Sequence, residues 1–293
     1  MQSVIIYGNC QAEAIVAVLQ RNPMLSQLFR FVYVRSFVHP SDAPAELPPE
    51  DLADCVLVAE QHDPRPFPYR DRLPAGCAAV SFPSVDCNLL WPFNTPNIYD
   101  APEPPEFPFG RFPYGDRIIA GCIQKGMSAS QILEYYLDGW DDYKLDMARL
   151  RQLELARMQA RDAHCMVKMS EYVFDTIPKR RLYWTSNHPS PELLTELTVR
   201  LVRACFNENA EIEAQADIAG TIAANFGPRG PLGVIGVPIH PRVAEFLELE
   251  WYDPKERLPY YGDRTMAYRE YFQNLIAASL RRKHALATAA AAV

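Results

Sequence analysis

The sequence predicts an α/β protein with an open, mostly parallel sheet flanked by helices. Short β-branched or aromatic runs recur through the first 82 residues, and turn signals separate them. The first of these runs breaks at a glycine and is followed at once by a helical pattern. The chain of 293 residues is 48% hydrophobic and 22% charged, which excludes a disordered or collagenous protein.

The first 82 residues predict four strands. Ser3–Tyr7 is expected as a buried strand that breaks at Gly8, and residues 11–20 have apolar positions at helical spacing. The remaining strands are expected at 28–34, 55–59 and 78–82. Intervals of about 20 to 25 residues between strands favour parallel pairing through crossover connections.

The rest of the chain predicts helices around a proline-rich loop at 83–113. Ser128 and Gln131 have the spacing of a capping box. The further elements expected are helices at 116–125, 128–137 and 141–162, a strand at 181–185, a helix at 192–205, a loop at 227–236, and C-terminal helices at 241–249 and 268–282. We expect one domain over 1–293, with a mostly helical insertion at 114–180 and a frayed alanine-rich tail at 285–293.

The charge balance and the cysteines exclude several classes of function. Lys and Arg number 29 against 36 Asp and Glu, a net charge of −7, which argues against a nucleic-acid partner. No apolar run approaches the ~18 residues of a membrane span, and no signal peptide is expected at the N-terminus. Seven scattered cysteines without a Cys-x-x-Cys pair argue against a disulfide framework and a thiolate metal site. These features predict a cytoplasmic protein without a metal.

The turn Gly8–Asn9–Cys10–Gln11 is the strongest candidate for chemistry. It places Cys10 at the carboxyl end of a strand, where open α/β sheets bind ligands, and at the start of a helix. The helix N-terminus is expected to lower the thiol pKa. Gly8 would let a substrate approach, and the amides of Cys10 and Gln11 with the Asn9 side chain would form an oxyanion hole. The alternative is that Cys10 is an inert buried residue.

Two histidines follow predicted strands at the same edge of the sheet. His188 follows 181–185, and His62 follows 55–59. Neutral imidazole is the usual partner that activates a thiol, and we predict His188 as the general base because its turn before Pro189 is rigid. Gln61 or His62 would donate a hydrogen bond to a substrate carbonyl.

The group that orients the His188 ring stays open between Asp63, Asn187 and Asn9. A different histidine, His240, precedes Pro241 and is expected to cap a helix.

Four motifs together resemble the WcbI family of polysaccharide biosynthesis, whose members are described as acetyltransferases of capsule formation. The motifs are Ile5-Ile6-Tyr7-Gly8-Asn9-Cys10-Gln11, Ser81-Phe82-Pro83-Ser84 leading to Trp91-Pro92, Asn187-His188-Pro189, and Pro238-Ile239-His240-Pro241. The resemblance covers most of the chain, from the first strand to Trp251.

The resemblance implies a coenzyme A-binding α/β protein, distantly similar to the three-layer SGNH hydrolases. Asn9 and Cys10 stand where those enzymes have Asp and the nucleophilic Ser of a Gly-Asp-Ser turn. Thr185 stands three residues before His188, where they have Asp, so the third member of a triad stays open. Ser84, in the second motif, is expected to contact the substrate.

The predicted function is a coenzyme A-dependent O-acetyltransferase that acts on a capsular or other surface polysaccharide precursor. Cys10 would be the nucleophile or the thiol that positions acetyl-CoA, and the acceptor would be a saccharide. Arg111, Arg117 and Lys125 are the candidate cations for the phosphates of coenzyme A. The alternatives are a cysteine-dependent esterase or thioesterase, and a non-catalytic component that binds coenzyme A or a glycan. Homo-oligomer formation stays open.

Overall fold

A computed structural model describes residues 1–36, 46–62, 65–100, 111–206 and 216–291. The chain divides into two compact units, and each unit contains two segments of the chain. Unit 1 comprises Met1–Asp86 and Leu155–Gly233, and unit 2 comprises Cys87–Glu154 and Val234–Val293. The single domain over 1–293 stays a prediction. No helix in the described ranges has the length and hydrophobicity that a membrane span requires.

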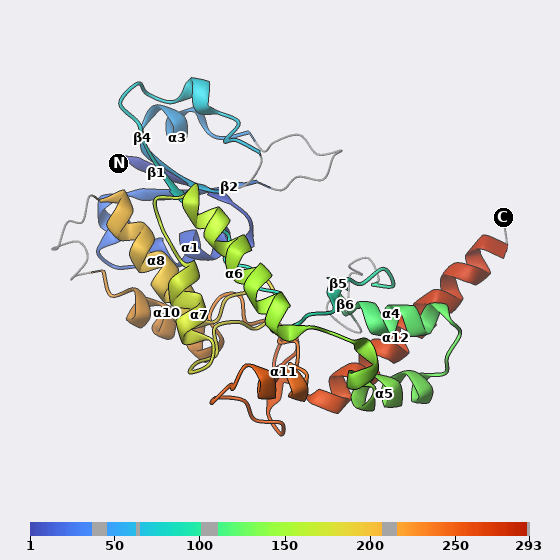
Figure 1. Cartoon of the computed structure of the whole chain (residues 1–293). Helices are drawn as coiled ribbons and strands as arrows, with labels where there is room; N and C mark the ends of the chain where they lie inside the picture. Colours follow the sequence, from blue (N-terminus) through green and yellow to red (C-terminus); the bar gives the residue numbers. More distant parts are fainter. Residues whose placement is uncertain (37–45, 63–64, 101–110, 207–215, 292–293) are drawn as a thin grey trace. The chain divides into compact units, whose positions relative to one another are not determined.

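Unit 1 contains the predicted sheet. Its strands are β1 (Ser3–Gly8), β2 (Arg30–Arg35), β3 (Cys55–Gln61) and β4 (Ala78–Phe82). They lie in the order β2-β1-β3-β4, and every pairing is parallel (Figure 1). The open parallel sheet is therefore confirmed, with β1 in its interior. Every residue of β1 is buried, as expected for a central strand with helices on both faces.

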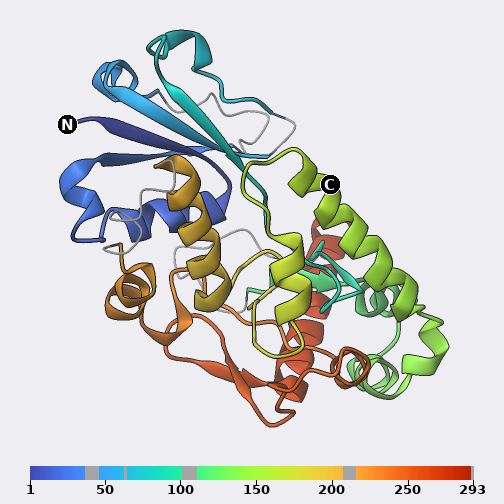
Figure 2. The same cartoon turned by 60° about the vertical axis from the view of Figure 1, so that its left-hand side comes forward.

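The two faces of the sheet are covered by different elements of unit 1. Ile5 and Tyr7 alternate along β1 and pack in one cluster with Leu52 of helix α3 (Pro49–Ala53) and with Phe67. Helices α1 (Cys10–Leu19) and α8 (Pro191–Cys205) pack on the opposite face (Figure 2). This gives the predicted layering of helices on both faces of a sheet.

Shorter elements complete unit 1, and several of them were not predicted. They are α2 (Leu25–Leu28), η1 (Arg70–Arg72), α7 (Ser170–Thr176), α10 (Ile218–Phe226) and η3 (Gly227–Arg229). The boundary between the units runs through α6 (Met147–Ala163), so the predicted insertion at 114–180 contributes to both units.

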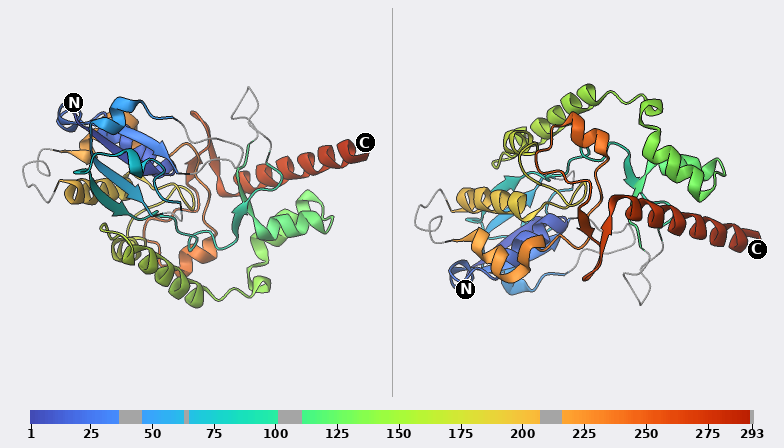
Figure 3. Two further views of the ribbon diagram at one scale, coloured as in Figure 1. Left: turned by 90° about the horizontal axis from the view of Figure 1, so that it is seen from above. Right: turned by 90° about the horizontal axis from the view of Figure 1, so that it is seen from below.

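Unit 2 consists of helices and two small hairpins. The hairpins are β5 (Asn94–Pro96) with β6 (Tyr114–Asp116), and β7 (Arg257–Pro259) with β8 (Thr265–Ala267). The helices are α4 (Arg117–Gln124), α5 (Ala129–Asp138), η2 (Trp140–Tyr143), α11 (Pro241–Phe246) and α12 (Tyr268–Ala291). Helix α12 packs against α4 and α5 (Figure 3). The predicted capping box of Ser128 and Gln131 is present at the start of α5.

Three predicted elements differ in the structure. Residues 181–185 form only one bridge, between Tyr183 and Pro189, because the chain turns back at once and the Trp184 amide donates to the His188 carbonyl. The helix predicted at 141–162 is interrupted after η2, where Lys144 has a left-handed φ of 48° that ends a helix. The alanine-rich tail continues α12 as far as Ala291, since alanine is the best helix former. Residues 101–110 of the proline-rich loop lie outside the described residues, as do 292–293.

Candidate active site

The Cys10 turn has the predicted strand–turn–helix geometry. Cys10 is the first residue of α1, directly after β1 and the N-cap residue Asn9. Asn9 has extended backbone angles, and its Oδ1 accepts a hydrogen bond of 2.8 Å from the Gln11 amide. Asparagine is among the best N-cap residues because its side chain replaces a missing helical acceptor. The local sequence therefore fixes the thiol at a helix N-terminus.

Gly8 is required because the Gln61 side chain packs directly against it. A Cβ at this position would lie 2.7 Å from Gln61 Oε1 and 2.8 Å from the Cβ of Ala12. Real Cβ atoms do not approach so closely. The space that the glycine provides is therefore used by Gln61, and approach of a substrate at Gly8 stays a prediction.

Two buried glutamines join the Cys10 turn to the rest of the sheet edge. Gln61 Oε1 accepts from the Asn9 amide at 2.9 Å, and Gln61 Nε2 donates to Gln11 Oε1 at 3.0 Å. Gln11 Oε1 also accepts from the Val85 amide at 3.1 Å. Both side chains are thus engaged within the protein, and a substrate contact by Gln61 stays a prediction.

The same network reaches the turn that carries His188. Gln11 Nε2 donates to the Asn187 carbonyl at 2.8 Å, and Gln11 is fully buried. A buried amide whose donor and acceptor are both satisfied is held rigidly. The structure therefore ties the chain segment before His188 to the helix that begins at Cys10.

Asn9 also connects Cys10 to an ionic cluster that sequence reasoning missed. Asn9 Nδ2 donates to Ser84 Oγ at 3.5 Å, and Ser84 Oγ donates to Asp86 Oδ1 at 3.1 Å. Asp86 is paired with Arg157 (Nη1–Oδ2, 2.6 Å) and with Arg161. The cluster places Ser84, a predicted substrate residue, between the thiol turn and two guanidinium groups.

The two arginines keep the Asp86 carboxyl group ionised. Burial alone would raise the pKa of this carboxyl, but Arg161 and Arg157 outweigh burial and hold the pKa below its usual range. The sequence places Arg157 and Arg161 four residues apart on a predicted helix, so that both face the same side. The pairing with Asp86 depends on a fold that brings residues 71 and 75 positions apart into contact.

The pKa of the Cys10 thiol is raised, which is the opposite of the expected direction. Burial is the largest cause, and the carboxylate of Glu13 acts in the same sense. The backbone amides of Cys10 and Gln11 lower the pKa, as the helix N-terminus predicted, but burial exceeds their effect. At neutral pH the thiol is therefore protonated and needs a proton acceptor before it can attack.

His188 is held in a turn that keeps its ring neutral. Burial lowers the pKa of His188 to about 4, despite the opposing effect of a hydrogen bond with the Leu232 backbone. The His188 amide donates to Thr185 Oγ1 at 3.2 Å, and that hydroxyl donates to Asn187 Oδ1 at 3.0 Å. Thr185 thus shapes the turn. Asp63, an alternative orienting group, lies outside the described residues.

His62 lies at the end of β3, as its sequence position predicted. Its amide donates to the Phe82 carbonyl at 2.7 Å, and its ring stacks on that of His164 with centroids 5.2 Å apart. A hydrogen bond from His62 to a substrate stays a prediction.

The three predicted cofactor-binding cations all lie in unit 2. Arg111 Nε is paired with Asp100 Oδ2 at 2.8 Å, and Arg117 donates to the Pro92 carbonyl at 2.7 Å. Lys125 is exposed at the C-terminal end of α4. His240, in the same unit, caps α11 as predicted, with Nδ1 accepting from the Arg242 amide at 3.2 Å. Within the described residues, no three His, Cys, Asp or Glu side chains are grouped as metal ligands.

Comparison with known proteins gives two matches that agree. Residues 3–208 match the family model of the polysaccharide biosynthesis enzyme WcbI. A solved structure of WcbI, called a novel polysaccharide biosynthesis enzyme, has a TM-score of 0.70 at 17% identity and covers 96% of this chain and 90% of its own. That structure is described as native protein without a disulfide bond between coenzyme A and a cysteine. Curated proteins give no match. On the family match, this chain belongs to the WcbI family of polysaccharide biosynthesis enzymes.

Proposed function

We propose that the protein transfers an acetyl group from acetyl-CoA to a hydroxyl of a polysaccharide precursor, with Cys10 as the nucleophile and His188 as the general base. The observation that carries this proposal is the position of Cys10, a thiol at the carboxyl edge of the sheet and at a helix N-terminus. The description of the similar WcbI structure links coenzyme A with a cysteine. This supports Cys10 as the thiol that meets the donor.

The first step is an exchange between two sulfur atoms. His188 takes the proton of the Cys10 thiol, the sulfur attacks the thioester carbonyl, and a new carbon–sulfur bond forms as the bond to the coenzyme A sulfur breaks. The leaving thiolate then takes the proton from His188. One thioester replaces another, so the step is close to balanced. The carbonyl oxygen becomes an oxyanion during the attack. The Gln11 amide, which the sequence predicted as one donor, is engaged with Asn9 Oδ1, so the Cys10 amide is the donor proposed to stabilise the oxyanion.

The second step returns Cys10 to its thiol form. A sugar hydroxyl attacks the acyl-cysteine, the carbon–oxygen bond forms as the carbon–sulfur bond breaks, and the hydroxyl proton passes through His188 to the departing sulfur. Burial lowers the pKa of His188 to about 4, so the ring carries no proton on its acceptor nitrogen at pH 7 when this step begins. The raised pKa of Cys10 supports the need for a base.

The anionic part of coenzyme A requires cations. We propose Arg157 and Arg161 first, because both guanidinium groups bond to Asp86, which bonds to Ser84 beside the Cys10 turn, and guanidinium groups are suited to binding phosphate. Binding of coenzyme A by Arg111, Arg117 or Lys125, all in unit 2, stays a prediction from the sequence.

The test is acetyl transfer by the purified full chain, measured with labelled acetyl-CoA and a surface-polysaccharide acceptor. We expect Cys10→Ala to lower the rate at least ~10²-fold and His188→Gln by about 10²-fold or more. Cys205→Ala is the matched control, since Cys205 is also a partly buried free thiol in unit 1. Full activity in Cys10→Ala would refute the proposal.

Mass spectrometry separates the covalent route from direct transfer. We expect labelled acetyl on Cys10 after the donor is added without acceptor, and its loss when acceptor follows. A transfer rate that depends on Cys10 without any labelled enzyme would mean that the thiol only positions the donor. Release of acetate without acceptor, at the rate of transfer, would identify a thioesterase. Binding of coenzyme A without turnover would identify a non-catalytic component.

A further inference from the structure

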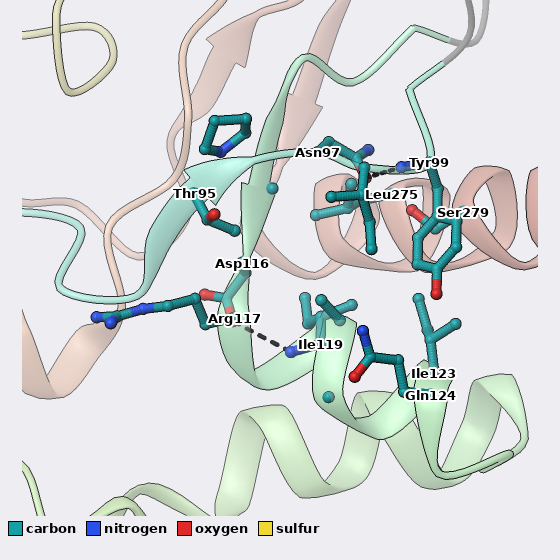
Figure 4. A pocket seen from close by; sticks show the side chains of 15 residues that line it. Thr95, Asn97, Tyr99, Asp116, Arg117, Ile119, Ile123, Gln124, Leu275 and Ser279 are labelled. Atoms are coloured by element: carbon teal, nitrogen blue, oxygen red, sulfur yellow. Dashed lines mark hydrogen bonds between the residues drawn. The ribbon is translucent and has the colours of Figure 1, made fainter.

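Unit 2 contains a cavity that the proposed reaction does not use. It has a volume of about 280 Å³ and is lined by residues of β5, the segment that follows it, α4 and α12 (Figure 4). Small-molecule sites typically measure about 300–1,000 Å³, so this cavity is of a size for one small ring rather than for a whole coenzyme A molecule.

The walls of the cavity are partly aliphatic. Ile119, Ile123 and Leu275 are buried side chains that form this part of the lining. Tyr99 adds an aromatic ring (Figure 4). These groups suit a ligand that has apolar C–H surface.

Polar groups in the lining lack protein partners. Ser279 is 2% exposed, and its hydroxyl has no hydrogen bond to any of the described residues. The same holds, within the described ranges, for the hydroxyls of Thr95 and Tyr99 and the amide of Gln124. Gln124 is exposed and Thr95 and Tyr99 are partly exposed, so their polar atoms are accessible to a ligand that supplies donors and acceptors.

The charged groups of the lining do not suit a polyanion. The Asp116 carboxylate caps α4 by accepting from the Ile118 and Ile119 amides at 2.8 and 3.2 Å. Arg117 is exposed and donates to a backbone carbonyl. A diphosphate is bound best by several cations. One guanidinium group beside a carboxylate would therefore bind it weakly.

We infer that this cavity binds one neutral sugar residue, whose ring faces contact the aliphatic and aromatic walls while its hydroxyls bond Ser279, Thr95 and Gln124. A sugar is the ligand class that combines apolar ring faces with many neutral donors and acceptors. The choice of this class rests on the family's role in polysaccharide biosynthesis and on the saccharide acceptor of the proposed function. It does not require that Cys10 is catalytic.

Saturation-transfer NMR on the full chain tests the inference, with a panel of neutral hexoses, 6-deoxyhexoses and N-acetylhexosamines at millimolar concentration. At least one sugar should bind. Gln124→Ala should weaken that sugar about fivefold through the loss of hydrogen bonds, and Ser279→Leu should abolish binding by filling the cavity. Gln152→Ala, an exposed glutamine of unit 2, is the matched control and should leave binding unchanged.

The Cys10→Ala protein should bind the sugar with unchanged affinity, so loss of the proposed reaction and loss of the sugar site are separate results. The inference is wrong if no sugar of the panel binds, or if both cavity variants bind it as the unmodified protein does. It is also wrong if the cavity variants weaken coenzyme A instead, since the cavity would then belong to the donor. Because Gln124 is exposed, Gln124→Ala is informative even if Ser279→Leu does not fold.

Discussion

Among the described residues, polar side chains are hydrogen-bonded within the protein at the Cys10 turn of unit 1, and several in the cavity of unit 2 are not. At the turn, the side chains of Asn9, Gln11 and Gln61 bond to one another or to backbone groups. In the cavity, Ser279 and Gln124 have no such bonds to the described residues. Hydrogen bonds within the protein fix a geometry, whereas the groups in the cavity are the ones we infer to bond a ligand. Substitutions should therefore change stability at the turn and ligand binding at the cavity.

The largest effect on stability is expected from Gln61→Leu. This change leaves the Asn9 amide without its acceptor and removes one of the two donors to Gln11 Oε1, which keeps the Val85 amide, and each hydrogen bond lost inside the protein costs about 1–3 kcal/mol. We expect the free energy of unfolding to fall by about 4 kcal/mol in urea titrations. Gln27→Leu, at an exposed position of unit 1, should change it by less than about 0.5 kcal/mol. A loss below about 1 kcal/mol in Gln61→Leu would mean that the network does not hold the turn.

Gly8→Ala should have the second largest effect on the free energy of unfolding. The new Cβ would overlap Gln61 Oε1 and the Ala12 side chain, and overpacking of this kind costs about 1–3 kcal/mol. We expect a value near the top of that range, together with loss of acetyl transfer. The matched control is Gly76→Ala, because no atom lies within 4 Å of a Cβ at Gly76. Equal unfolding free energies for the two variants would contradict the packing seen at Gly8.

The titration of His188 should have a smaller effect on the free energy of unfolding. Its pKa in the folded protein is about 4 and its ordinary value is 6.5, so the unfolded chain binds more protons between these values. The stabilisation by the neutral ring is present above pH 6.5 and is lost as the pH falls toward 4. Between pH 7 and pH 5 the loss from this group is about 2 kcal/mol.

Urea titrations at both pH values measure this effect as a difference. His188→Gln should lose about 2 kcal/mol less than the unmodified protein between pH 7 and pH 5. Contributions from His240, whose pKa burial also lowers to about 4, occur in both proteins and cancel. Identical pH dependence in both proteins would show that His188 is not buried as described.

Substitutions of the polar side chains in the cavity should have the smallest effect on the free energy of unfolding. Thr95→Val and Gln124→Ala remove groups that have no partners in the described structure, so the unfolding free energy should change by less than about 0.5 kcal/mol. Sugar binding should weaken in the same variants. A large loss of stability would place these side chains in a structural network and would remove the contrast between the two regions.

Several elements of both units could be predicted from local patterns. The strand at 78–82 begins and ends where the sequence placed it, and the Ser128 capping box forms as expected, because both depend on residues close together in the chain. The helix at 141–162 was predicted too long, since nothing in its composition marks the left-handed Lys144. The small hairpins of unit 2 were missed because their three-residue strands are too short to show a period.

The sequence by itself determined that a thiol stands between a buried strand and a helix, because a glycine, an N-cap asparagine and an apolar periodicity act over a few residues. Only the tertiary structure decided what surrounds that thiol. Gln11 meets Gln61 across 50 residues and Asn187 across 176, and such contacts are set by the packing of the sheet rather than by neighbours in the chain. The direction of the Cys10 pKa was decided in the same way, because burial is a property of the folded protein and it outweighs the helix N-terminus.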